Sequence, residues 1–287
     1  MPLTASQISD FNEQGFLIVE NAITATQLAG LQVDFKRWVE ESRQYQKAYG
    51  EIADGRARFD LEPGHSQTQP ALRRVSSPQE VSEAFLAVMR DNKALDALAQ
   101  LYGPNLKFNN AKINAKMPGA ATQVKYHQDF VFEPHSNDDL ATVLIFLDDV
   151  DANNGPLEIV PGSHKGPLYE HWHDGVFTGA IDDKITQREQ PKAITCTGPA
   201  GTACIMHTRA LHGSATNFSN SSRTVYIVEY AAEDAIPLID NHIPSGQEGE
   251  IVRGVATGRI RSSVFDLATP EYPQGTSFFS QQVKHGE

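Results

Sequence analysis

Seven short segments between residues 106 and 232 constrain the fold more than any other feature of the chain. Each is rich in β-branched or aromatic residues, tends to alternate apolar with polar positions, and is bounded by Gly, Pro, Asn or Asp. The segments are LKFNNAKINAKM, VKYHQDFVF, TVLIFLDDV, LEIVPG, KAITCTG, TACIMHT and RTVYIVEYA. Successive side chains of a strand point to opposite faces of a sheet, so this pattern predicts short strands. Such a series is typical of an antiparallel sandwich or barrel.

The first 105 residues favour helices instead. Three pairs have the spacing of a capping box, in which a hydroxyl and a side chain three residues later satisfy each other's backbone amides: Thr4 with Gln7, Thr24 with Gln27, and Ser77 with Glu80. The third start, with Pro78 at its first position, leads into one helix that Gly103-Pro104 ends. FLIV at 16–19 reads as a short strand between the first two helices.

These elements predict one α+β, mainly β domain over 1–287. We expect a helical shell over about 1–105, a β core over about 106–232 and a turn-rich segment over 233–287. The stretch at 45–76 is polar, contains glycine and lacks periodicity, which favours either a lid or binding loop or plain disorder. The turn-rich segment at 233–287 is a second candidate lid.

Composition narrows the classes of partner. The chain has 287 residues, with 36 acidic side chains against 24 basic ones, and no cluster of Lys or Arg, so nucleic acid is not expected as a partner. No stretch reaches the roughly 18 apolar residues of a membrane span. The first twenty residues lack a basic region followed by an apolar one, which favours a cytoplasmic protein. Cys196 and Cys204 are expected to be free, buried thiols, and a small molecule is the expected partner; nothing indicates the oligomeric state.

Two motifs suggest a metal site. His127 and Asp129 stand two apart, so a regular strand would aim both at one face; a surface ion pair would explain them as well. His212 opens a polar turn, and Arg223 follows eleven residues later at the start of a β-prone strand. Two histidines and a carboxylate form the facial triad typical of non-haem Fe(II) oxygenases. A neighbouring arginine would bind a carboxylate through two hydrogen bonds.

Three strings carry a resemblance to a known family. YHQDF, NNGPLEIVPGSHKG at 153–166 and LHGSATNFSNSSRTV together resemble the phytanoyl-CoA dioxygenase-like family of Fe(II)- and 2-oxoglutarate-dependent oxygenases. The resemblance covers most of the chain and implies a double-stranded β-helix, the jelly-roll core of cupin-like proteins. It makes His127, Asp129 and His212 the catalytic iron ligands, with His207 as the competing third ligand. It also pairs Arg223 with the C5 carboxylate of 2-oxoglutarate.

The segment KINAKMPG extends this resemblance to the ectoine hydroxylases of the same family. That resemblance assigns Asn114 to the cosubstrate and Lys112 to the substrate. On a regular strand these two would share a face with Asn110 and Lys116, although a solvated strand face would give the same pattern. Remaining assignments are Ser214 and Asn110 to the cosubstrate, and Lys116 and Phe132 to the substrate. Phe132 and Phe130 are the candidates for the aromatic residue after the metal motif, where ectoine hydroxylases carry tryptophan.

The resemblance implies a hydroxylase that uses Fe(II), 2-oxoglutarate and O2 on an unactivated C–H bond and releases succinate and CO2. Lys112, Lys116 and the arginines at 253, 259 and 261 suggest a cationic pocket for a small anionic or zwitterionic substrate. Two other classes share such cores: metal-dependent isomerases or hydrolases, and ligand-binding relatives without activity.

Overall fold

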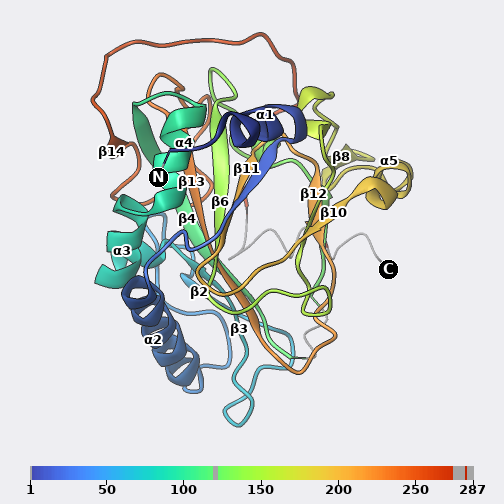
Figure 1. Cartoon of the computed structure of the whole chain (residues 1–287). Helices are drawn as coiled ribbons and strands as arrows, with labels where there is room; N and C mark the ends of the chain where they lie inside the picture. The colour runs from blue at the N-terminus through green and yellow to red at the C-terminus, as the bar shows by residue number, and fades with distance from the viewer. Residues whose placement is uncertain (1, 119–121, 274–281, 283–287) are drawn as a thin grey trace.

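Two antiparallel sheets form the centre of the molecule (Figure 1). The computed structural model describes residues 2–118, 122–273 and 282. The larger, eight-stranded sheet has the order β1 (Phe16–Val19), β11 (Ala203–His207), β6 (Leu140–Phe146), β13 (Arg223–Ala232), β4 (Leu106–Lys116), β3 (Leu72–Ser76), β2 (Phe59–Leu61), with β14 (Ile251–Arg253) also paired to β4. The smaller sheet has the order β10 (Ile194–Cys196), β7 (Leu157–Ile159), β12 (His212–Ser214), β5 (Val124–His127). A separate hairpin pairs β8 (Trp172–His173) with β9 (Val176–Phe177).

The two sheets pack against each other through apolar side chains. Phe146 of β6 and Val225 of β13 belong to the same buried cluster as Ile159 of β7 and Cys196 of β10. The predicted α+β class with a jelly-roll core is therefore confirmed. Cys196 and Cys204 are free and buried as expected, but they lie on facing sheets, with their Sγ atoms 3.9 Å apart.

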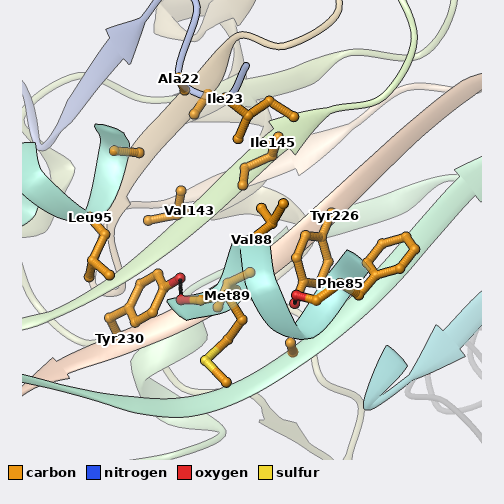
Figure 2. Packing of buried hydrophobic residues seen from close by; sticks show 14 of the residues in the cluster. Ala22, Ile23, Phe85, Val88, Met89, Leu95, Val143, Ile145, Tyr226 and Tyr230 are labelled. Atoms are coloured by element: carbon orange, nitrogen blue, oxygen red, sulfur yellow. Dashed lines mark hydrogen bonds between the residues drawn. The ribbon is translucent and has the colours of Figure 1, made fainter. Parts of the chain in front are cut away.

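Helices cover the opposite face of the larger sheet. They are α2 (Ala25–Ser42), α3 (Glu83–Arg90) and α4 (Lys93–Leu101), whereas α1 (Ala5–Gln14) precedes β1 and α5 (Asp183–Glu189) lies beside the smaller sheet (Figure 1). Figure 2 shows Tyr226 and Tyr230 of β13 lying against α3. Their hydroxyls donate to the carbonyls of Phe85 and Met89, at 3.2 and 2.7 Å. The Phe85 ring also stacks on Trp38 of α2, with ring centroids 5.3 Å apart.

The helix starts test the capping predictions. Thr4 and Thr24 each make both hydrogen bonds of a capping box, as predicted. The third prediction was wrong, because Ser77 is left-handed, with φ of 49°, and its side chain caps nothing. A 3-10 turn, Pro78–Glu80, follows it. The expected single helix is two, α3 and α4, which begin at the N-caps Ser82 and Asn92.

Strands appear at all seven predicted segments and also where none was expected. The segment at 45–76, predicted as a lid, binding loop or disorder, contains β2 and β3, which extend the larger sheet beside β4. His212 lies in strand β12 rather than in a turn. In the segment at 233–287, β14 is followed by a stretch without helix or strand up to residue 273; residues 274–281 and 283–287 lie outside the described residues. No helix in the described part of the chain is long and apolar enough to span a membrane.

A β-bulge divides β4 into two parts. Glu229 of β13 pairs with Asn110 and the next residue, Tyr230, pairs with Phe108, so Asn109 has no cross-strand partner. An extra residue shifts the alternation of side chains by one. Leu106 and Phe108 therefore face the helices before the bulge, as do Ala111 and Ile113 after it. As a result, Asn110, Lys112, Asn114 and Lys116 share the face toward the smaller sheet, as their spacing predicted.

Candidate metal centre and substrate pocket

The three predicted metal ligands meet at the edge of the smaller sheet. His127 ends β5 and pairs directly with His212, which begins β12. Asp129 was expected to continue the strand, but it begins a 3-10 turn, Asp129–Val131, that turns its carboxylate toward both imidazoles. One Asp129 oxygen lies 3.3 Å from Nε2 of His127 and 3.6 Å from Nε2 of His212. The three ligand atoms lie within 4.8 Å of one another.

Hydrogen bonds fix the orientation of these side chains. Nδ1 of His127 lies 2.8 Å from the Lys125 carbonyl, and Nδ1 of His212 lies 3.0 Å from the Ala210 carbonyl. Each Nδ1 must donate to its carbonyl, which leaves both Nε2 atoms as electron-pair donors. The second Asp129 oxygen accepts a 2.7 Å hydrogen bond from the Thr142 hydroxyl on β6. Two imidazole nitrogens and one carboxylate oxygen therefore converge, as a facial triad requires.

Burial and charge set the protonation of the triad. Burial alone would raise the pKa of Asp129, but His212 and His127 outweigh it and hold that pKa far below its ordinary value. Burial, together with His127, lowers the pKa of His212 to about 4. At neutral pH the carboxylate is charged and His212 is neutral, which are the states that bind a divalent cation.

Arg223 lies in the same cavity between the two sheets, at the start of β13. Its Nε and one Nη donate to the Gly155 carbonyl, at 2.9 and 2.5 Å. Burial lowers the pKa of Arg223 to about 10, while the Asp148 carboxylate favours the charged form, so the guanidinium remains protonated at neutral pH. Leu144, Phe146 and Ile227 line the same cavity. An anion would thus meet a fixed cation between apolar walls, where charge pairs are strongest.

Lys116 is the direct cross-strand neighbour of Arg223. Its Nζ lies 2.8 Å from the Ser214 hydroxyl and 3.3 Å from the Ser214 carbonyl, and it also contacts the Ala215 carbonyl. Burial, reinforced by Arg223, lowers the pKa of Lys116 to about 6. Lys116, which was predicted to contact substrate, lies in the cavity beside Arg223 and Ser214, which were predicted to contact the cosubstrate.

The other predicted residues of β4 divide into two groups. Lys112 and Asn114 line the cavity, and Lys112 forms an ion pair with Glu229 of β13 at 3.3 Å. Asn110 is fully buried and donates to the carboxylates of Glu133 and Glu229, at 2.7 and 3.4 Å. Asn110 therefore holds two acids in place.

Phe132 and Phe130 differ in their position relative to the cavity. The Phe132 ring lines the cavity edge-on to His127, with centroids 5.7 Å apart. Phe130 is fully buried against Phe265, outside the cavity. Of these two candidates, only Phe132 lies in the cavity beside the triad.

Comparison with known proteins agrees with this geometry. A profile of the family described as phytanoyl-CoA dioxygenase (PhyH) matches residues 11–225. The chain is also 33% identical, over 275 residues, to a probable alpha-ketoglutarate-dependent hypophosphite dioxygenase of Stutzerimonas stutzeri, a match that covers 94% of this chain and 92% of that protein. The chain belongs to the phytanoyl-CoA dioxygenase family. It is therefore a non-haem iron dioxygenase that depends on 2-oxoglutarate.

Two further matches extend the comparison of this family member. An L-proline trans-4-hydroxylase of Streptomyces griseoviridis is 30% identical over 205 residues, which cover 64% of this chain and 75% of that protein. The crystal structure of EctD from S. alaskensis with bound Fe has a TM-score of 0.65 at 19% identity and covers 91% of this chain and 88% of that one. The likeness to EctD shows that the two chains share a fold.

Some predicted residues of this phytanoyl-CoA dioxygenase family member lie away from the cavity. The competing ligand His207 ends β11, and its ring faces Tyr102 and His164. The arginines at 253, 259 and 261 are absent from the described cavity lining; Arg253 pairs with Asp91 and Asp96, and Arg261 with Asp139 and Asp234. The part of the cationic-pocket hypothesis that used these arginines was therefore wrong.

The cavity of this dioxygenase also contains residues that the sequence analysis missed. They are Arg56, Arg74, Glu133, Thr142, Glu229 and His242. Glu229 could have been found, because it is a carboxylate in an otherwise apolar strand and stands an even number of residues from Arg223. Arg56, Arg74 and His242 carried no such signal, since they lie in segments that read as loops.

Proposed function

We propose that His127, Asp129 and His212 bind Fe(II), that Arg223 binds the C5 carboxylate of 2-oxoglutarate, and that the enzyme hydroxylates an unactivated C–H bond of a small anionic or zwitterionic molecule. The observation that carries the proposal is the convergence of three buried ligand atoms within 4.8 Å in the cavity that Arg223 also lines. Once bound, the iron and 2-oxoglutarate supply the oxidising chemistry with O2, releasing succinate and CO2.

The chain's own residues orient and shield the reactants. Arg223 holds one end of 2-oxoglutarate, and the Gly155 carbonyl holds Arg223. Leu144, Phe146 and Ile227 exclude water around that ion pair, which strengthens it. Thr142 keeps one Asp129 oxygen occupied and aims the other toward the two imidazoles.

The charged residues of the cavity lining support the proposal of a charged substrate. Arg74 and Lys112 line the cavity together with the acids Glu133 and Glu229. The relatives' names point to charged molecules, since one is named a probable hypophosphite dioxygenase and another an L-proline trans-4-hydroxylase; hypophosphite is an anion and L-proline a zwitterion. Charged candidates should therefore support succinate release, whereas neutral analogues of the same size should not. Equal turnover of charged and neutral analogues would contradict this part of the proposal.

An anaerobic titration tests the cofactor assignment. Fe(II) and then 2-oxoglutarate are added to metal-free protein, and the weak visible charge-transfer band of the chelate is recorded. The proposal expects the band in the wild type and in Arg37→Ala, a control at an exposed arginine of α2, and much weaker binding of 2-oxoglutarate in Arg223→Ala. A folded wild type that binds metal without forming the band would overturn the proposal in favour of a redox-inert isomerase or hydrolase.

A further inference from the structure

Arg74 is a buried cation with unused hydrogen-bond donors. It lies on β3 opposite Asn114 of β4 and lines the cavity. Its side chain is almost fully buried, with 3% of the residue exposed. Nε and one Nη have no hydrogen-bond partner. Asp60, the cross-strand neighbour of Arg74 on β2, favours the charged form of Arg74, but its carboxylate pairs with Arg73 at 2.7 Å. Burying a guanidinium without a partner is unfavourable, so this arrangement calls for an explanation.

Glu133 is a buried acid with an unused hydrogen-bond acceptor. It lies four residues after Asp129, lines the cavity and is 3% exposed. One carboxylate oxygen accepts from the amides of Asn109 and Asn110, the two neighbours at the bulge of β4. The other oxygen has no partner. The nearest cationic candidate, Nδ1 of His242, lies 3.9 Å from the oxygen that the amides already hold, and burial keeps the pKa of His242 well below its ordinary value.

Two other cations of the cavity lining, Lys112 and Arg56, have partners within the protein. Lys112 pairs with Glu229 at 3.3 Å, and Arg56 pairs with Asp54 at 2.7 Å. Arg56 also donates to the His242 carbonyl at 2.6 Å. Among the described residues of the cavity lining, Arg74 therefore keeps two unpartnered donor atoms and Glu133 one unpartnered carboxylate oxygen.

We infer that the substrate is a zwitterion whose anionic group binds Arg74 and whose ammonium group binds Glu133. The inference rests on the proposed function and narrows its substrate class to small molecules of the amino acid or aminoalkylphosphonate type. Arg74 and Glu133 line one cavity without pairing with each other, so a ligand that carries both complementary charges satisfies both at once. A simple anion would satisfy Arg74 but would meet the carboxylate of Glu133 uncompensated.

Calorimetric binding to the wild type tests the charge requirement. The protein is loaded anaerobically with Fe(II) and 2-oxoglutarate, and the chelate band confirms loading. The probes are the linear amino acids from glycine to 5-aminopentanoate and 2-aminoethylphosphonate, each compared with the acid that lacks the amine and with the amine that lacks the acid. We expect at least one zwitterion to bind about tenfold or more tightly than both of its truncated analogues. If no zwitterion binds while the chelate band forms, or if a truncated acid binds equally well, the inference is overturned.

Two variants assign each charge to its residue. Arg74→Gln should weaken binding of the zwitterion about tenfold or more and leave binding of the matched amine unchanged. Glu133→Gln should weaken the zwitterion similarly and leave the matched acid unchanged. Both variants should keep the 2-oxoglutarate affinity of the wild type, and thermal unfolding should show that both fold. Equal losses for all three probes would overturn the assignment, whereas a wild type without the chelate band would overturn the proposed function itself.

Discussion

Lys116 gives a quantitative prediction, because its folded-state pKa of about 6 lies far below its ordinary value of 10.5. The perturbation is Lys116→Met, which removes the titrating group and keeps much of the side-chain volume. Between pH 7 and pH 9 the folded protein holds this amine mostly neutral, whereas the unfolded chain protonates it. The unfolded state therefore binds one more proton, and the free energy of unfolding rises with pH. The slope is about 1.4 kcal/mol per pH unit, so the contribution of Lys116 grows by roughly 3 kcal/mol across this range.

Urea unfolding of the metal-free protein at several pH values measures this effect. Groups that titrate identically in both proteins cancel when the free energy of unfolding of the variant is subtracted from that of the wild type. That difference should increase in favour of the wild type by roughly 3 kcal/mol from pH 7 to pH 9. Parallel pH curves for the two proteins would refute the reasoning, because they would mean that Lys116 stays protonated in the folded state.

Three further variants test other parts of the structure. Thr142→Val removes the 2.7 Å hydrogen bond to Asp129 and should lower Fe(II) affinity about ten- to hundredfold; an unchanged metal titration would contradict this. Gly155→Ala should lower both the melting temperature and the affinity for 2-oxoglutarate, because Gly155 has φ of +77°, its new Cβ would lie 2.7 Å from a backbone carbonyl, and its own carbonyl holds Arg223. A variant as stable as wild type would show that this turn adapts. Phe85→Ala should lower the free energy of unfolding by about 3–5 kcal/mol in urea, and a loss below ~1 kcal/mol would mean that the helix layer repacks.

The metal ligands could be found from the sequence because their signals are local. His127 and Asp129 lie within one segment, and His212 precedes Arg223 by a short turn. The structure brings the three ligands together as expected, although Asp129 reaches the cluster through a 3-10 turn rather than along a strand. Local spacing suggested a metal site and the family resemblance chose its residues, but neither predicted the backbone that presents them.

The substrate side depends on contacts that local patterns do not encode. Arg74 faces the cavity because β3 pairs with β4, and this pairing joins segments about forty residues apart. Its neighbourhood has no apolar periodicity, so it read as a loop. Similarly, Ser77 has the composition of a helix cap but adopts a left-handed conformation that ends β3. In both places tertiary packing overrides the local preference.

The bulge at Asn109 determines how Glu133 is held in the cavity. One unmatched residue in β4 lets two successive amides reach the same carboxylate of Glu133, while the strand beyond it keeps its register with β13. Loss of Asn109 would restore the regular alternation of β4 and remove one of the two amides that hold Glu133, whereas His127 and His212 lie on the smaller sheet and Asp129 on the turn that follows it.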